Sequence, residues 1–289
     1  MIPKKILEAK FRKLVEEDVG QGDITTLLTV PSGTIVEARV LAKELGVIAG
    51  IGEAAVFLES FGLQVDSLLT DGSKVKAKTA ILKIVGDART LLSIERTLLN
   101  LLSRMSGIAT STHRLVERVR KAGYTTRVAC TRKVAPGLSY FDKRAVMIGG
   151  GDTHRLHLDD MILVKDNHLA VIGSLGTAVK RVREAVSFSK KVEVEVSTIE
   201  EALEAAKANV DIVMLDNFTP DHAKKTIELL KKKGLRKKVL LESSGGITEK
   251  NILAFAAVGV DIISMGEMTA SAKALDMSLE IVKVEKHES

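Results

Sequence analysis

The sequence predicts an α/β protein in which an N-terminal module of mixed strands and helices precedes a C-terminal barrel of alternating strands and helices. Short β-type runs and turn pairs fill the first third of the 289 residues. From about residue 124 six strand-like runs follow, and helical segments separate most of them, which predicts a parallel sheet. A content of 45% hydrophobic and 28% charged residues is typical of a folded globular chain.

The N-terminal module is predicted from its β-type segments. Two of them are TIVEARVLAK (34–43) and KVKAKTAILKIVG (74–86), and the turn pair Asp71-Gly72 lies between them. Strands broken by tight turns, with helical segments around them, indicate an α+β arrangement.

A long helix is expected to link the two parts of the chain. The leucines of residues 88–107 recur at helical spacing, so this helix would bury one face and leave Glu95 and Arg96 at or near its edge. The domain boundary is therefore expected near residue 107. The expected parts are the module (1–107), the barrel (108–270) and a tail (271–289) with a helical portion and an apolar end that packs back on the module.

The barrel is predicted from six runs: TTRVAC, MILVKDN, KVEVEVS, DIVMLDN, KVLLESS and VDIISMG. Closure into a barrel is favoured over an open doubly wound sheet because no dinucleotide-binding GxGxxG follows the first run. Helix starts support the alternation. Ser197 with Glu200 predicts a capping box, and Thr219-Pro220 predicts an N-cap followed by an N1 proline.

Composition excludes several classes of protein. The 43 Lys and Arg exceed the 37 Asp and Glu, which permits an anionic ligand, but with no Trp and two Tyr we expect no nucleic-acid partner. The single cysteine, Cys130, excludes an internal disulfide. No apolar run approaches the ~18 residues of a membrane span, and the charged N-terminus lacks a signal-peptide core, so we expect a cytoplasmic protein without a membrane partner.

Cationic residues collect where the predicted strands end, at the edge on which barrels carry their active sites. They are Arg132, Lys133, His154, Arg155 and Lys165. Any one of them alone would be read as a solvated charge. Together they would repel one another unless an anion neutralised them, so a phosphate or carboxylate ligand is the better interpretation.

Carboxylates occupy the next two strands. Alternation in KVEVEVS places Glu193 and Glu195 on the face opposite its valines, so the glutamates would point into the barrel, and Asp216 ends the following strand. One interpretation is an interior layer of salt bridges. The other is a functional pair, Glu195 and Asp216, facing a developing positive charge or a hydrated metal ion.

A short glycine turn offers a possible phosphate site. Ser243-Ser244-Gly245-Gly246 follows the fifth run and precedes a predicted helix, so its backbone N–H groups could hold a phosphate. As a glycine motif alone this signal is weak. Cys130 is expected only to fill a strand position, because the sequence nominates no general base beside it.

Seven motifs occur in an order that resembles the quinolinate phosphoribosyltransferase family. They are EEDVGQGDITT (16–26), ERTLLNLLSRMSGIAT (95–110), TRKVAPGL (131–138), GGGDTHRLHLDDMILVKDNH (149–168), VEVEV (192–196), MLDN (214–217) and ESSGG (242–246). The resemblance runs from about residue 8 to 281. It implies an N-terminal α/β sandwich followed by an open TIM-like α/β barrel, in a homodimer with shared active sites that could assemble further into a hexamer.

The resemblance also implies an activity. The family converts quinolinate and phosphoribosyl pyrophosphate, with Mg²⁺, into nicotinate mononucleotide, pyrophosphate and CO₂, a step in NAD biosynthesis. By this resemblance, quinolinate's carboxylates would be held by Arg132, His154, Arg155 and Lys165, with Arg96 from the partner subunit. Phosphoribosyl pyrophosphate and Mg²⁺ would meet Lys133, Glu195 and Asp216, the last two holding the metal indirectly, and the 5′-phosphate would meet Ser244, Gly245 and Gly246.

Three positions depart from the family pattern. Val134 and Ser139 stand where the family usually has Thr and Arg, and Ala270 stands where a His often follows Thr269. A hydroxyl and a cation are thereby missing, which keeps two alternatives open: a ModD-type relative, or a phosphoribosyltransferase for another pyridine acid. A barrel that only binds an anion or nucleic acid without turnover is the alternative from a different class.

Overall fold

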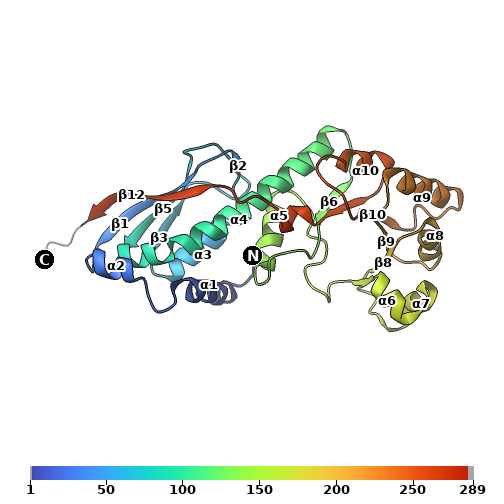
Figure 1. The fold of residues 1–289 in the computed structure, drawn as a ribbon, viewed down its shortest axis with the longest axis horizontal. Coiled ribbons are helices and arrows are strands. Elements are labelled where there is room, and N and C mark those ends of the chain that lie inside the picture. Colours follow the sequence, from blue (N-terminus) through green and yellow to red (C-terminus); the bar gives the residue numbers. More distant parts are fainter. Residues whose placement is uncertain (1, 286–289) are drawn as a thin grey trace. The chain divides into compact units, whose positions relative to one another are not determined.

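The computed structural model describes residues 2–285 of the chain (Figure 1). These residues fall into two units. The first comprises the described parts of Met1–Ser111, Met147–Gly149 and Ala272–Ser289, and the second comprises Thr112–Val146 and Gly150–Ser271. Helix α4 (Ala88–Lys121) supplies residues to both, and the boundary expected near residue 107 lies inside it.

The N-terminal unit is built on a four-stranded antiparallel sheet in the order β12-β1-β5-β3. Its strands are β1 (Ile35–Ala42), β3 (Gln64–Ser67), β5 (Ala80–Asp87) and β12 (Met277–Glu285), and a separate ribbon pairs β2 (Gly46–Val47) with β4 (Lys74–Val75). Val36, Ala38 and Val40 alternate along β1 and are buried on one face. Period-two burial on one face is what a sheet covered on one side requires.

Helices cover one face of this sheet, which gives the sandwich that the resemblance implies (Figure 1). They are α1 (Lys4–Val19), α2 (Ile24–Thr29), α3 (Ile51–Ser60) and the first part of α4. Phe11 of α1 meets Phe57 of α3 edge to face with their ring centroids 5.0 Å apart, and both side chains are buried. Aromatic packing of this geometry stabilises the contact beyond the area it buries.

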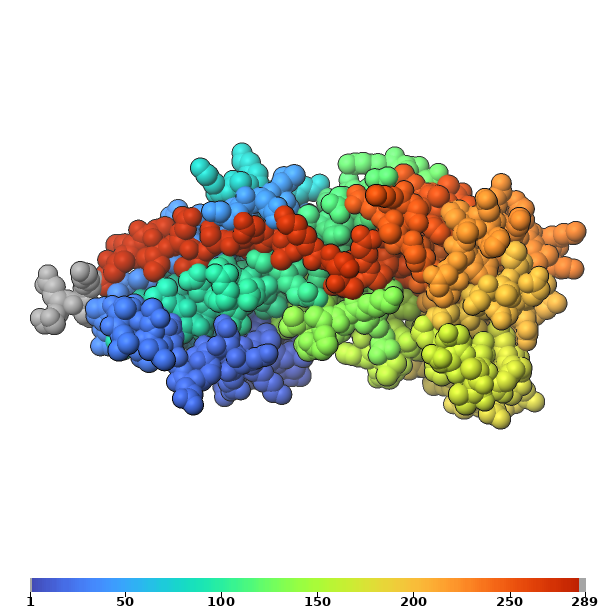
Figure 2. Space-filling model, in the orientation of Figure 1, coloured from blue at the N-terminus to red at the C-terminus, as the bar shows by residue number. Residues whose placement is uncertain are grey.

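The C-terminal tail differs from the sequence prediction. The prediction of a helical portion within residues 271–289 is wrong, because Met277–Glu285 form strand β12. This strand pairs along its length with β1, and Figure 2 shows the red C-terminal segment lying along the N-terminal residues of this unit. Pairing with a neighbouring strand satisfies backbone groups that the short apolar run could not satisfy as an isolated helix.

The second unit contains a six-stranded parallel sheet in the order β6-β11-β10-β9-β8-β7. Its strands are β6 (Arg127–Cys130), β7 (Ile162–Val164), β8 (Val192–Val196), β9 (Ile212–Asp216), β10 (Leu240–Ser244) and β11 (Ile262–Met265). The six predicted runs are thereby confirmed as strands. Because β6 and β7 are the two ends of this order, the barrel is open, as the resemblance implies.

Helices alternate with the strands of this unit. They are α5 (Ser139–Ile148), α6 (Asp166–Ile172), α7 (Leu175–Ala185), α8 (Ile199–Lys207), α9 (Pro220–Lys232), α10 (Ile252–Val258) and α11 (Glu267–Ala270). Thr219 caps α9 and Pro220 occupies N1, which confirms that prediction. The predicted Ser197–Glu200 capping box is wrong by one residue: Thr198 caps α8 and pairs with Glu201. Both pairs have the required spacing, and the helix begins where the chain leaves β8.

Every helix among residues 2–285 is too short or too polar to span a lipid bilayer.

Candidate active site

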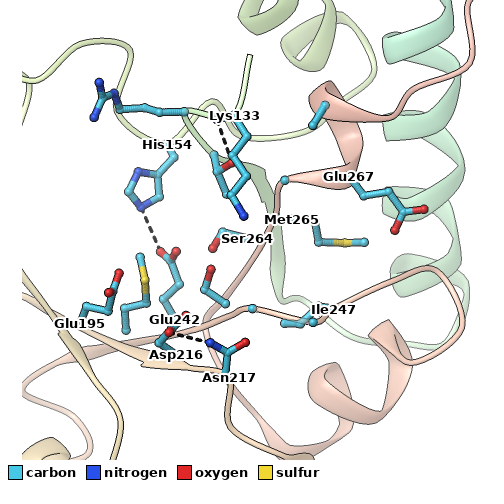
Figure 3. Close-up of a pocket in the computed structure, with 18 of the residues that line it drawn as sticks. Lys133, His154, Glu195, Asp216, Asn217, Glu242, Ile247, Ser264, Met265 and Glu267 are labelled. Carbon is cyan, nitrogen blue, oxygen red and sulfur yellow. Dashed lines mark hydrogen bonds and ion pairs between the residues drawn. The ribbon is translucent and has the colours of Figure 1, made fainter. Parts of the chain in front are cut away.

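A cavity of about 780 Å³ opens at the C-terminal ends of the barrel strands. Residues within or directly after all six strands contribute to its lining, and Figure 3 shows Lys133, His154, Glu195 and Asp216 around this space. Ten of the eleven predicted site residues line it: Arg132, Lys133, His154, Arg155, Lys165, Glu195, Asp216, Ser244, Gly245 and Gly246. The topology of a parallel barrel brings these distant segments to one edge.

Arg96, the eleventh residue, does not line this cavity. It is exposed on α4 in the N-terminal unit. Its proposed contribution from a partner subunit therefore stays a prediction.

The cationic part of the cavity includes a buried arginine whose charge is disfavoured by its surroundings. Arg155 is only 8% exposed, and burial lowers the pKa of its guanidinium, with the positive charge of Arg132 lowering it further. A buried guanidinium with a second positive charge nearby favours binding of an anion.

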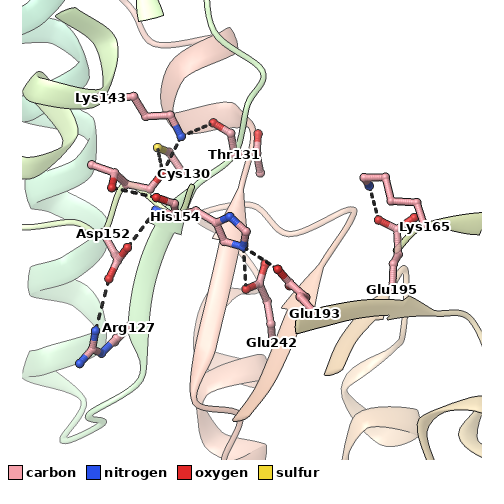
Figure 4. A network of polar contacts seen from close by, with 11 residues as sticks. Arg127, Cys130, Thr131, Lys143, Asp152, His154, Lys165, Glu193, Glu195 and Glu242 are labelled. Carbon is pink, nitrogen blue, oxygen red and sulfur yellow. Dashed lines mark hydrogen bonds and ion pairs between the residues drawn. The ribbon is translucent and has the colours of Figure 1, made fainter. Parts of the chain in front are cut away.

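Buried contacts fix the loops that carry these cations. The ammonium group of Lys143, on α5, donates to the carbonyl oxygen of Thr131 at 2.9 Å, as Figure 4 shows. It also donates to the carbonyl oxygen of Thr153. Lys143 is 2% exposed. The Thr269 hydroxyl donates to the Lys133 carbonyl oxygen at 2.7 Å. These bonds position the residues on either side of Arg132 and the residue before His154, so the binding groups need little ordering when a ligand arrives.

The carboxylate part of the cavity comes from neighbouring strands β8 and β9. Glu195 forms an ion pair with Lys165, and its side chain is 11% exposed. The Asp216 carboxylate accepts a hydrogen bond from the Asn217 side-chain amide at 2.7 Å. Each carboxylate therefore has one fixed neighbour and retains lone pairs for a ligand.

A second set of carboxylates lies inside the barrel. The imidazole Nε2 of His154 lies 3.3 Å from a carboxylate oxygen of Glu193 and 3.2 Å from one of Glu242, and both glutamates are 0% exposed. Glu193 thus belongs to a buried salt-bridge layer, whereas Glu195 reaches the cavity. A functional role for Glu195 with Asp216 stays a prediction.

The glycine turn after β10 has a backbone that side chains disfavour. Gly245 has φ +84°, and a Cβ atom built there would lie 2.9 Å from the backbone nitrogen of Asn217. Asn217 itself is held by a 2.9 Å hydrogen bond from its N–H to the Ser244 carbonyl oxygen. A turn this close to the neighbouring strand end requires glycine, and it exposes main-chain groups to the cavity.

Three contributors to the site escaped the sequence prediction. Glu242 lies in KVLLESS, where the alternation used for KVEVEVS would have placed it inward. Asn217 and Lys143 carried no such signal, since their importance depends on contacts with Gly245 and with the carbonyl groups of Thr131 and Thr153.

Cys130 fills the last position of β6, as expected. Its side chain is buried, and burial raises the pKa of its thiol. A buried thiol of this kind is a poor nucleophile.

The cavity residues suit a hard divalent cation. Glu195 and Asp216 provide carboxylate oxygens, the ligand type that Mg²⁺ prefers, and they lie in an open cavity that a phosphate-bearing substrate can share. Mg²⁺ is commonly held by one or two carboxylates together with water and substrate phosphates. This donor set therefore fits Mg²⁺ better than a transition metal that prefers thiolates.

Two family models match the chain. "Quinolinate phosphoribosyl transferase, N-terminal domain" matches residues 23–106, and "Quinolinate phosphoribosyl transferase, C-terminal domain" matches residues 108–280.

Relatives and solved structures agree with these matches. A Methanothermobacter thermautotrophicus protein named "Probable nicotinate-nucleotide pyrophosphorylase (carboxylating)" is 47% identical over 94% of this chain and 97% of its own length. The Rattus norvegicus "Nicotinate-nucleotide pyrophosphorylase (carboxylating)" is 38% identical over 97% and 93%. The solved structure of the nicotinate-nucleotide pyrophosphorylase from Francisella tularensis superposes with a TM-score of 0.86 at 36% identity, over 97% of this chain and 98% of that one.

Proposed function

The chain belongs to the quinolinate phosphoribosyltransferase family, and we propose that its cavity transfers a phosphoribosyl group from phosphoribosyl pyrophosphate to the ring nitrogen of quinolinate. Loss of the 2-carboxylate as CO₂ then gives nicotinate mononucleotide, with pyrophosphate as the other product. The observation that carries this proposal is the grouping of five cationic side chains and two accessible carboxylates around one cavity. A dianionic acid and a polyphosphate ester need such a cationic surface, and a sugar cation needs such carboxylates.

Quinolinate is proposed to bind through its two carboxylates. Arg132, His154, Arg155 and Lys165 line the cavity and supply positive charge or N–H donors for them. Planar guanidiniums suit bidentate carboxylate binding, whereas Lys165 acts as a point charge. Arg96 of a second subunit is proposed to complete this set, which makes the protein a homodimer with shared sites. Assembly of such dimers into a hexamer stays a prediction.

The ribose side of the reaction is assigned to the carboxylates. As the bond to pyrophosphate lengthens, C1 of the ribose gains positive charge, and Glu195 and Asp216 would stabilise that charge more than the neutral ground state. Lys133 would contact the departing pyrophosphate, and the backbone groups of Ser244, Gly245 and Gly246 would hold the 5′-phosphate. When bound beside Glu195 and Asp216, Mg²⁺ would neutralise charge on the pyrophosphate.

Decarboxylation needs no protein nucleophile. Once the ring nitrogen carries the ribose it is positively charged, and it can stabilise the electron pair that the departing CO₂ leaves on C2. That pair then accepts a proton. The protein's task at this step is to hold the remaining carboxylate in place, which the cationic side chains can do.

The three positions that depart from the family pattern could affect which pyridine acid the cavity accepts. Ala270 lines the cavity, whereas Val134 and Ser139 do not. Of the three departures, Ala270 is therefore the one placed to alter the choice of pyridine acid, as in a ModD-type relative. The cytoplasmic location stays a prediction.

The assay that tests this function measures pyrophosphate release from phosphoribosyl pyrophosphate and Mg²⁺ with quinolinate or nicotinate as the acceptor. We expect release with quinolinate and little with nicotinate, because nicotinate has only one of the two carboxylates that the cationic residues are proposed to bind. Preference for nicotinate would support the alternative acceptor. Nucleic-acid binding that weakens with salt, without any pyrophosphate release, would support the non-catalytic alternative.

Substitution of the cationic residues should weaken quinolinate binding selectively. Arg132→Ala, Arg155→Ala and Lys165→Ala each remove a charge-assisted contact worth roughly 1.5 to 3 kcal/mol, so the KM for quinolinate should rise roughly 10- to 100-fold. The KM for phosphoribosyl pyrophosphate should change much less. Arg181→Ala, which removes an exposed arginine of α7, is the matched control. Equal losses for both substrates would indicate collapse of the cavity instead.

Gly245→Ala should impair phosphoribosyl pyrophosphate binding. The new Cβ would meet the Asn217 backbone and displace the turn, so we expect the KM for this substrate to rise about tenfold or more. Gly259→Ala is the control, because Gly259 also has positive φ (+89°) but a Cβ there meets nothing within 4 Å. It should cost roughly 1 to 2 kcal/mol of stability and leave both KM values unchanged. Steady-state kinetics and thermal melts on both variants decide whether the turn holds a phosphate.

A further inference from the structure

His154 is held at the cavity wall by two carboxylates that do not themselves belong to the proposed substrate-binding set. Its Nε2 lies 3.3 Å from Glu193 on β8 and 3.2 Å from Glu242 on β10 (Figure 4). The histidine side chain is 10% exposed, and it lines the cavity together with Glu242. One ring nitrogen is thus committed to the protein interior while the ring borders the ligand space.

The two glutamates have an unusual environment for charged groups. Both are 0% exposed, and within residues 2–285 their oxygens accept no hydrogen bond. His154 is the group in ion-pair contact with both of them, and Arg155 adds positive charge near Glu193. Buried carboxylates are strongly unfavourable without a compensating cation, and burial raises the pKa of Glu193, so positive charge at His154 is what favours the ionised form of both glutamates.

The backbone of His154 is fixed as firmly as its ring. Its φ of +52° is uncommon for a residue with a side chain. The Asp152 carboxylate accepts a hydrogen bond from the His154 N–H at 2.9 Å, and the Thr153 hydroxyl donates to the His154 carbonyl oxygen at 2.9 Å. A strained conformation that neighbouring contacts enforce is commonly found where a side chain must be placed for function.

The charge state of His154 follows from these neighbours. Burial alone would lower the pKa of the imidazole, but the carboxylates of Glu193 and Glu242 outweigh burial and raise that pKa to about 10. An ordinary histidine, with a pKa near 6.5, would lose most of its positive charge between pH 6 and 8. The other charged groups nearby are Arg155, which follows it in the chain, and Asp152, which meets its backbone.

We propose that Glu193 and Glu242 are positioning residues that fix the His154 ring and keep it an imidazolium, so that it meets a quinolinate carboxylate as a permanent cation. Neither glutamate needs to touch substrate for this role. The part of the proposal that concerns quinolinate rests on the proposed function, whereas the charge and placement of the ring do not. An anionic substrate would then be bound with the same strength through the neutral pH range.

The direct test is a ¹³C NMR titration of the histidine rings in the full chain without substrates. The protein has six histidines, so the His154 signal can be assigned by its loss in His154→Asn. In the wild type it should stay protonated through pH 8. In Glu242→Gln and in Glu193→Gln, each of which keeps one carboxylate, its midpoint should fall by about 1 to 3 units. Glu200→Gln removes an exposed glutamate of α8 and should leave the titration unchanged.

Kinetics provide the second readout. Relative to wild type at each pH, the KM for quinolinate in Glu242→Gln should rise about tenfold between pH 7 and 9, because the imidazolium fraction then falls through this range. The KM for phosphoribosyl pyrophosphate should keep a constant ratio to wild type. A role in stability alone would change the melting temperature without this pH-dependent separation of the two KM values.

Three results would overturn the proposal. One is a neutral His154 in the wild type at pH 7, which requires no variant to fold. Another is an unshifted titration in both glutamine variants. The third is a stoichiometric metal ion bound by these three side chains in the purified protein, since their ligand atoms are close enough to share one. Because the titration needs no turnover, an active enzyme with a neutral His154 would contradict only this proposal, and an inactive protein with a charged His154 only the proposed function.

Discussion

Glu195→Gln and Asp216→Asn should each lower kcat about 100- to 1,000-fold, because each removes a fixed negative charge from the place where the ribose becomes positive. Stability should change little. Glu195 pairs with a lysine whose side chain is 40% exposed, and such partly exposed pairs contribute only about 0 to 1 kcal/mol. Single-turnover kinetics and thermal melts on the same samples measure both effects.

Glu193→Gln provides the contrast for this prediction from the same strand. Glu193 is 0% exposed, so removing its charge unbalances a buried ion pair and should cost roughly 3 to 5 kcal/mol of stability. Two glutamates separated by one residue should therefore differ in kind: loss of Glu195 should appear mainly in kcat, and loss of Glu193 in the melt and in the charge of His154. A Glu195→Gln variant that is strongly destabilised but turns over normally in its folded fraction would remove Glu195 from the catalytic set.

Mixing inactive Arg96→Ala subunits with inactive Glu195→Ala subunits should restore activity. In a hybrid dimer, one barrel keeps its own Glu195 and receives Arg96 from its neighbour, so one of its two sites is complete. Random exchange makes half the dimers hybrid, so activity should recover to about a quarter of the wild-type value. Exchange is followed by mass spectrometry of differently tagged subunits, and activity is assayed on the same mixture.

The matched control mixes Arg132→Ala with Glu195→Ala. Both residues line the cavity of the same barrel. In a hybrid dimer, one site therefore lacks Arg132 and the other lacks Glu195. No recovery is expected. If subunits exchange and Arg96→Ala behaves like Arg132→Ala, Arg96 does not act across the dimer.

The strands and the cavity could be predicted because they follow from local pattern. Alternation in KVEVEVS identified which residues of β8 point inward, and the polar residues after each run identified the active-site edge. The same alternation could have identified Glu242 as an inward-pointing residue. Its contact with His154 could not be predicted, because His154 is 88 positions earlier and the two meet only through the curvature of the barrel.

Other features depended on contacts that no local pattern encodes. The cap of α8 shifted by one residue because Ser197 and Thr198 both have an acidic residue three positions ahead, and the exit of β8 selects between them. The C-terminal residues became β12 because β1 presents an edge with unpaired backbone groups, which outweighs local helical preference. The role of Lys143 depends on two carbonyl groups brought together by the fold.

The most direct test of the central claim uses quinolinate labelled with ¹⁴C in its 2-carboxylate. With phosphoribosyl pyrophosphate and Mg²⁺ present, labelled CO₂ should be released in equal amount to pyrophosphate, and omission of phosphoribosyl pyrophosphate should abolish both. Pyrophosphate release without labelled CO₂, or no release of either product by folded protein, would contradict the assignment of this cavity to phosphoribosyl transfer with decarboxylation.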